Sequence, residues 1–101
     1  MICVDPLMRH GWVIRGKPTA SCHMWTVSED MEELHRFAES IGLKRAWFQP
    51  ATKPRSINHY DLTPSKRAAA VAAGAIELDA RDAVNAWRAL WGEPPLGAPH
   101  G

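Results

Sequence analysis

Three of the five histidines and two aspartates have side chains that can bind a metal ion or transfer a proton. They are His23, His35, His59, Asp5 and Asp61. Neutral imidazole and carboxylate groups suit zinc, manganese or iron, and three or four of them with one open position make a catalytic metal site. We therefore predict a divalent metal ion, zinc or manganese, whose ligands are His23, His35, His59 and Asp61. The spacing matches no HExxH-type motif, so the residue types carry this prediction.

A metal-free alternative uses the same residues. His59 and Asp61 lie two positions apart in the stretch NHYDLTPSKR, and side chains two apart in an extended segment point the same way. Asp61 would then orient His59 as a general acid or base near neutral pH. In both versions the predicted catalytic residues are His59, Asp61 and Asp5. A structural alternative also stays open, in which Asp61 braces the next helix and His35 is a hydrogen-bonded core histidine.

Two cations follow directly after a predicted helix start at Thr63 and Pro64. Lys66 and Arg67 oppose the helix dipole there, since the first turn of a helix prefers acidic side chains. A phosphate or carboxylate at this point would meet free backbone N–H groups and positive charge together. The alternative is that at least one of the two cations points into solvent. The predicted substrate-binding residues are Lys66, Arg67, Gln49 and Tyr60, and the predicted ligand is a phosphate-bearing small molecule or a nucleic acid.

Alternating strand and helix patterns predict how these residues are positioned. We expect short strands at 2–4, 45–49 and 75–78, and helices that begin after Thr26, Thr63 and Asp79. Residues 7–25 are interrupted by glycine and proline, and are read as two short strands or an ordered loop. This order predicts a small α/β domain of two or three layers, with a short, mainly parallel sheet and about three helices.

A parallel sheet would gather the chemistry at one edge, because ligands of such sheets bind beyond the carboxyl ends of the strands. Asp5, Gln49 and Asp79 end the three predicted strands. His23 and His59 lie in the segments that lead into the first two helices. We therefore expect the candidate residues to lie on one rim of the domain.

The composition indicates one small domain. The chain has 101 residues, and we predict a single domain over 1–92 and a flexible tail over 93–101, which is rich in proline and glycine. Trp47, Trp87 and Trp91 are expected in the core. The two cysteines lack CxxC spacing, and no signal peptide or transmembrane-length run is apparent, so we expect reduced thiols and a cytoplasmic location.

The net charge of +1 excludes a global attraction to nucleic acids or anionic membranes. Binding of a polyanion would need a local cluster of cations. The segment 9–12, with Arg15 and Lys17 after it, is locally basic and aromatic and is a weak signal of this kind. The oligomeric state stays open.

Several short motifs occur in an order that resembles the family catalogued as domain of unknown function 4031, which groups small uncharacterised proteins of bacteria and phages. The matching motifs are Val4-Asp5, His23-Met24, Glu33-Leu34-His35, Ile41-Gly42, Trp47 with Gln49, His59-Tyr60-Asp61, Lys66-Arg67 and Gly74-Ala75. The resemblance covers roughly residues 2–78 and implies no activity, so the function has to be argued from chemistry.

Two functions are consistent with these observations. The first is a small enzyme, a hydrolase or phosphoesterase acting on a phosphate-bearing nucleotide or a nucleic acid, with or without a metal ion. The alternative is a non-catalytic accessory module that binds a nucleotide or a protein partner through the same residues. A third interpretation makes the histidines and carboxylates a polar brace between helix starts and the sheet.

Overall fold

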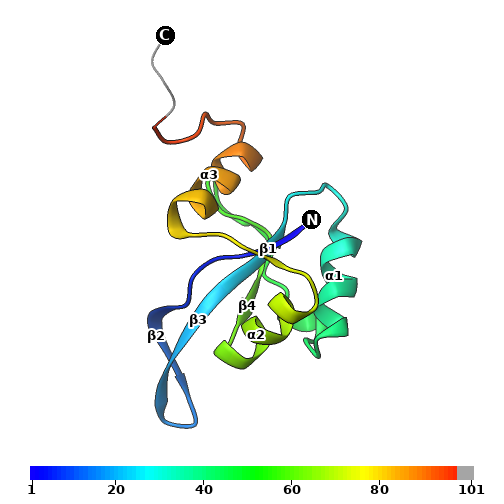
Figure 1. Ribbon diagram of the computed structural model, residues 1–101, viewed down its shortest axis with the longest axis vertical. Helices are drawn as coiled ribbons and strands as arrows, with labels where there is room; N and C mark the ends of the chain where they lie inside the picture. The colour runs from blue at the N-terminus through cyan, green and yellow to red at the C-terminus, as the bar shows by residue number, and fades with distance from the viewer. Residues whose placement is uncertain (98–101) are drawn as a thin grey trace.

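The computed structural model describes residues 1–97, without the side chains of residues 10–12. Five strands and three α-helices, with one short 3₁₀ helix, make up the described chain (Figure 1). The strands are β1 (Ile2–Val4), β2 (Met8–Ile14), β3 (Lys17–Thr26), β4 (Tyr60–Leu62) and β5 (Ile76–Glu77). The helices are α1 (Met31–Ser40), η1 (Arg45–Trp47, the 3₁₀ helix), α2 (Pro64–Ala72) and α3 (Ala80–Leu90).

The long strand β3 is the centre of the sheet. It pairs antiparallel with β1, β2 and β4, and the only parallel pair among the described residues joins β1 to β5. The α/β class and the three helices are confirmed, whereas the prediction of a mainly parallel sheet is wrong. The reason lies in residues 7–25, because β2 and β3 form a hairpin whose second strand continues into the core.

One of the three predicted strands is absent. Strands are found at 2–4 and 76–77, but the segment predicted at 45–49 begins with the 3₁₀ helix η1. Gln49 then makes an isolated antiparallel bridge to His59, which adds a short pairing beyond β4. This part of the chain therefore lies beside the sheet edge instead of inside a parallel sheet.

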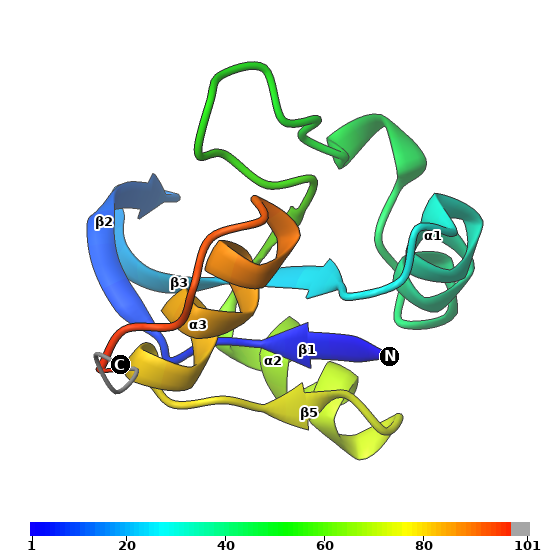
Figure 2. The same ribbon diagram turned by 90° about the horizontal axis from the view of Figure 1, so that it is seen from above.

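Two clusters of buried side chains lie on opposite faces of the sheet. The larger cluster packs α1 and α2 against β3 and β4 through Met24, Leu34, Tyr60, Leu62 and Ala70. The smaller one, which includes Cys3, Trp25, Ala83 and Trp87, packs α3 on the other face. In Figure 1, α3 lies above β1 and α2 below it, and in Figure 2, seen from above, α2 lies partly behind β1. Alternating side chains along β3 and β4 therefore point to different helices.

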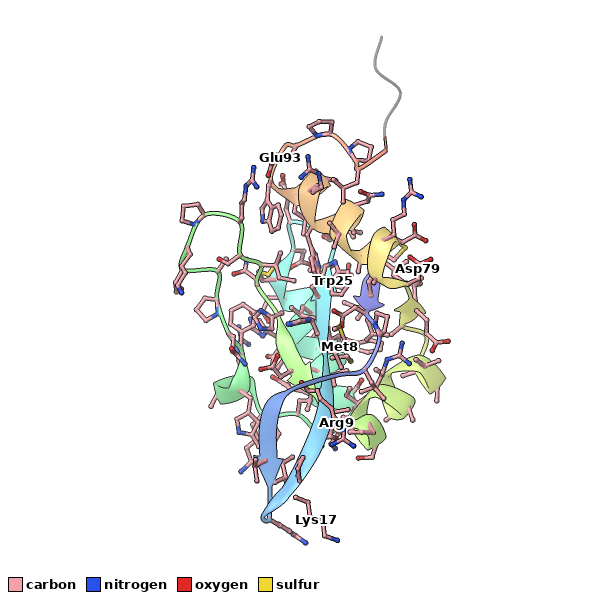
Figure 3. All side chains as sticks on the ribbon, turned by 90° about the vertical axis from the view of Figure 1, so that its left-hand side faces the viewer. Met8, Arg9, Lys17, Trp25, Asp79 and Glu93 are labelled. Atoms are coloured by element: carbon pink, nitrogen blue, oxygen red, sulfur yellow. The ribbon has the colours of Figure 1, made fainter. Side chains whose placement is uncertain are left out.

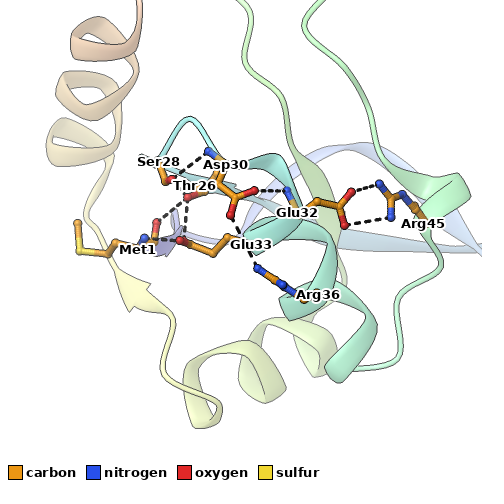
Figure 4. A network of polar contacts seen from close by, with 8 residues as sticks. All are labelled: Met1, Thr26, Ser28, Asp30, Glu32, Glu33, Arg36 and Arg45. Atoms are coloured by element: carbon orange, nitrogen blue, oxygen red, sulfur yellow. Dashed lines mark hydrogen bonds and ion pairs between the residues drawn. The ribbon is translucent and has the colours of Figure 1, made fainter.

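Side-chain caps begin all three α-helices. Thr63 Oγ1 accepts from Lys66 N at 3.3 Å with Pro64 as the first helical residue, and Asp79 Oδ1 accepts from Asp82 N at 2.7 Å. Both predicted starts are confirmed. The start predicted after Thr26 is wrong, because Thr26 is the last residue of β3 and Asp30 caps α1. The cap belongs to the polar network of Figure 4, in which Arg45 from η1 also binds Glu32.

The two cysteines are free and buried, as expected for Cys3 and Cys22. Trp87 packs against the smaller core cluster, whereas Trp47 is 50% exposed, so its predicted core position is wrong. Among the described residues no helix has the length and apolar character needed to cross a membrane. The tail is predicted at 93–101, and the structure describes it as far as residue 97. Within this part, the N–H of Leu96 donates to Asn85 Oδ1 in α3.

Candidate metal centre on the α3 face of the sheet

Strand register places three candidate residues in a row across the sheet. His23 in β3 is the direct antiparallel partner of Asp61 in β4. Asp5 follows the last residue of β1, and its N–H donates to the His23 carbonyl at 3.3 Å. Because Tyr60 is buried on the α1/α2 face, Asp61 and His59 on either side of it point to the α3 face. The residues gather on a sheet face and not at the predicted rim.

Three of these side chains form a cluster of metal-ligand type. His23, His59 and Asp61 each offer one ligand atom, and these atoms lie within 4.8 Å of one another. Zinc bonds of about 2.0–2.2 Å place tetrahedral ligands about 3.4 Å apart. A metal ion would therefore draw the three side chains slightly inward. The two imidazole rings already meet edge to face, with centroids 5.1 Å apart.

Each imidazole is oriented through its Nδ1 atom. His23 Nδ1 lies 2.8 Å from Oδ2 of the buried Asp5, whose Oδ1 accepts the His23 backbone N–H at 2.6 Å. His59 Nδ1 lies 2.8 Å from the Ile57 carbonyl and must donate to it, since a carbonyl can only accept. Ligand histidines in metal sites are held by such partners. A metal ion on these residues would therefore bind through Nε2 of each ring.

His59 and Asp61 also perturb each other's ionisation. Burial lowers the pKa of His59, but the hydrogen bonds to Asp61 and the Ile57 carbonyl outweigh it and raise this pKa above its usual value. The hydrogen bond from His59 lowers the pKa of Asp61 against the effect of burial, and Gln49 Nε2 contributes by donating to Asp61 Oδ2. His59 Nε2 lies 3.5 Å from Asp61 Oδ1. A positive charge, either a proton or a metal ion, is thus favoured between these two atoms.

A cleft of about 520 Å³ adjoins the cluster. Its lining residues are Ile14, Leu43, Trp47, Gln49, Asp61, Thr63 and Lys66. Most of the wall is apolar, and the volume is in the usual range for small-molecule sites. Of the three cluster residues Asp61 is the one that also lines the cleft, so a molecule bound in the cleft can contact the cluster through Asp61.

Two predicted site residues lie on the opposite face. His35 and Tyr60 are 6% and 0% exposed, and His35 Nδ1 is 2.6 Å from Tyr60 Oη. The His35 ring also packs edge-on against Phe48, with centroids 4.6 Å apart. Burial raises the pKa of the Tyr60 hydroxyl. The structure therefore places His35 among core residues, away from the other predicted ligands, and Tyr60 away from the cleft.

The two cations of α2 both have partners within the protein. Arg67 Nε donates to the Asp5 carbonyl at 2.9 Å, and another guanidinium nitrogen lies 2.8 Å from Glu77 Oε1. Arg67 therefore helps to hold Asp5, which in turn orients His23. Lys66 Nζ donates to the Ile41 carbonyl at 2.8 Å but also lines the cleft. Of the two predicted anion-binding residues, Lys66 is the one at the candidate site.

Two further groups at the site had not been singled out from the sequence. Trp87 from α3 packs edge-on against His23, with ring centroids 5.6 Å apart. The Ile57 carbonyl fixes the tautomer of His59. The helical stripe predicted Trp87 as a core residue only, and no sequence signal marks a backbone carbonyl as a partner of a side chain.

Comparison with known proteins agrees with the resemblance noted in the sequence. A family model described as "Protein of unknown function (DUF4031)" matches residues 2–90. The match runs from the first residue of β1 to the last residue of α3 and includes every residue of the metal-ligand cluster and the cleft. No curated protein and no solved structure matches the chain.

Proposed function

The chain belongs to the DUF4031 family, and we propose that it is a metal-dependent hydrolase acting on a phosphate ester of a nucleotide or nucleic acid. The observation that carries this proposal is the cluster of His23, His59 and Asp61, whose ligand atoms lie within 4.8 Å of one another. The Nδ1 contacts to Asp5 and to the Ile57 carbonyl support it, because they orient both rings as ligand histidines are oriented in metal sites.

The type and number of ligands suit zinc or manganese in a catalytic setting. Two imidazoles and one carboxylate leave at least one coordination position for water, whereas structural zinc sites use four protein ligands. A bound ion of this kind supplies a Lewis acid and a water molecule whose pKa is lowered to about 7. Asp5 holds the His23 ring in place, and Gln49 holds Asp61 through Oδ2. The other carboxylate oxygen of Asp61 faces His59.

The cleft provides room for the substrate beside this cluster. Lys66 on its wall uses one ammonium hydrogen for the Ile41 carbonyl, and an ammonium group has three. The other two can bind a phosphate oxygen close to Asp61. The apolar walls around Leu43 and Trp47 suit a nucleobase or another flat group. This arrangement favours a ligand with one charged and one apolar end.

Hydrolysis assays with metal-loaded protein test the proposal. Bis(4-nitrophenyl) phosphate and a panel of mononucleotides would be offered to protein loaded with zinc or manganese. We expect turnover that a chelator abolishes and that His59→Gln and Asp61→Asn each lower by at least about 100-fold. Asp82→Asn is the matched control, because Asp82 is an exposed aspartate in α3, and its turnover should be unchanged.

Two outcomes would contradict the proposal. Turnover that survives both the chelator and the His59 and Asp61 substitutions would remove the metal ion from the mechanism. Binding of a nucleotide without any product, at every metal tested, would indicate the non-catalytic binding module instead.

A further inference from the structure

We propose that the β2–β3 hairpin is a binding arm for single-stranded nucleic acid, which makes the substrate of the metal site a polymer and not a free mononucleotide. This inference rests on the proposed function. The hairpin extends away from the helices, with Lys17 at its tip (Figures 1 and 3). It is joined to the metal site by β3, which contains His23.

The hairpin is positively charged and has no acidic residue. No aspartate or glutamate occurs between Asp5 and Glu29, whereas Arg9, Arg15 and Lys17 all lie in this interval and are exposed. None of these three cations has an ion-pair partner among residues 1–97. By contrast, five arginines elsewhere each lie within 4.0 Å of a carboxylate: Arg36, Arg45, Arg55, Arg67 and Arg88. The local charge on the hairpin is thus hidden in the chain's net charge of +1.

The turn of the hairpin places an arginine where other residues fit better. Arg15 and Gly16 both have positive φ, 52° and 77°, as a type I′ turn requires. Asparagine, aspartate and glycine are the residues that adopt this conformation at low cost. Arg15 is therefore strained at the tip of the hairpin, and backbone strain of this kind is typical of functional positions.

The cleft extends from the hairpin to Asp61 of the proposed metal site. Ile14, next to Arg15, lines the cleft together with Trp47, Lys66 and Asp61. Trp47 is half exposed, and Lys44 Nζ lies 5.6 Å from the centroid of its ring. Single-stranded nucleic acids bind to such surfaces by stacking bases on aromatic rings while cations follow the backbone. Trp47 is thus the base-stacking residue in this proposal.

The length of β3 determines how long a ligand must be to contact both the hairpin tip and the metal site. Six residue steps along the strand from Lys17 to His23 correspond to roughly 20 Å. A mononucleotide at Asp61 does not reach the tip of the hairpin, but several linked nucleotides do. A ligand that contacts both Lys17 and the metal site is therefore several linked nucleotides long.

Binding to a fluorescein-labelled oligothymidylate, long enough to span the hairpin and the cleft, tests this inference. Arg15→Glu is compared with Arg81→Glu, an equal charge change at an exposed position of α3, far from the hairpin (Figure 1). We expect Arg15→Glu to weaken binding at least about 10-fold and Arg81→Glu to change it less than about twofold. The logarithm of the wild-type affinity should fall with the logarithm of salt concentration with a slope of about −2, for three phosphate contacts to a single strand.

Arg15→Asn separates binding from folding. Asparagine fits the type I′ turn, so this variant should have a melting temperature at least equal to that of the wild type while binding the oligonucleotide more weakly. Oligonucleotide affinity that is unchanged by Arg15→Glu, or equal for duplex and single strand, would overturn the binding arm and leave the metal-dependent activity standing. If Arg15→Glu loses oligonucleotide affinity but the wild type shows no metal-dependent turnover, the result would support the binding arm and reject the proposed function.

Discussion

The two faces of the sheet use the same kinds of residue in different ways. In the stretch His59-Tyr60-Asp61, the Tyr60 side chain points to the α1/α2 face, where it is hydrogen-bonded to His35 inside an apolar cluster. The side chains of His59 and Asp61 point to the α3 face, where they form a partly exposed cluster with His23. A histidine whose partner is another core side chain indicates a structural role. Histidines that are each oriented through one ring nitrogen, in a cluster whose aspartate lines a cleft, indicate a functional site.

The largest expected effect concerns the thiol on the α1/α2 face. Burial and the negative charge of Asp5 raise the pKa of Cys22 to about 12, and the opposing effect of the nearby Arg67 is smaller. At pH 8, the thiolate fraction should be about 1000-fold below that of an exposed cysteine, and alkylation of the folded protein should slow accordingly. Peptide mapping after iodoacetamide treatment, with urea-unfolded protein as the control, measures this. Similar alkylation rates for Cys22 in the folded and unfolded protein would show that the thiol is not protected by burial on this face.

Alanine substitutions of His35 and His59 should differ in how much they lower the stability of the fold. His35→Ala removes a buried ring and leaves the Tyr60 hydroxyl without its partner, which should lower the free energy of unfolding by about 2–4 kcal/mol. The matched change His59→Ala, on the partly exposed face, should cost at most about 1 kcal/mol in metal-free protein. Urea unfolding of both variants gives the comparison. The two roles would have to be exchanged if His59→Ala were the more destabilising variant.

Asp5→Asn should weaken the metal site without removing a ligand. Asp5 is a positioning residue, since it orients His23 through Nδ1 and the backbone N–H. Loss of such a partner typically lowers metal affinity 10- to 100-fold. Zinc competition titrations would measure the dissociation constant, and Asp82→Asn is the control. An unchanged dissociation constant would show that the contact between Asp5 and His23 serves stability only.

The smallest effect is expected at the exposed network on α1. The hydrogen bond from Arg45 lowers the pKa of Glu32, so this pair stabilises the fold above the usual pKa of glutamate. The contribution is lost as the pH falls through the lowered pKa. Because both side chains are exposed, solvent screening keeps the effect on stability small. NMR titration of Glu32 should show a lowered pKa that returns towards the usual value in Arg45→Ala, and an unchanged pKa in that variant would contradict the assignment.

Local capping chemistry was readable from the sequence. The starts of α2 and α3 depend on Thr63, Pro64 and Asp79, which act on the residues next to them. The start of α1 was misplaced, because Thr26 is also a capping residue type but is held in β3 by its pairing with Ile2. That pairing joins residues far apart in the chain, which no local pattern records.

The candidate site shows the same limit. The alternation of His59, Tyr60 and Asp61 predicted that His59 and Asp61 share one face. The approach of His23 to Asp61 depends on the register between β3 and β4, and the role of Asp5 depends on the pairing between β1 and β3. His35 lies on the buried stripe of α1 as its spacing indicated, but the sequence could not name Tyr60 as its partner.

Zinc content is the most direct test of the proposed metal centre. Purified wild-type, His59→Ala and His35→Ala proteins would each be loaded with zinc, desalted and analysed for bound metal per folded chain. We predict one equivalent in the wild type and in folded His35→Ala, and none in His59→Ala, because only His59 lies in the cluster with His23 and Asp61. Absence of bound zinc in the wild type, or equal zinc content in the wild type and His59→Ala, would contradict a metal centre on the α3 face.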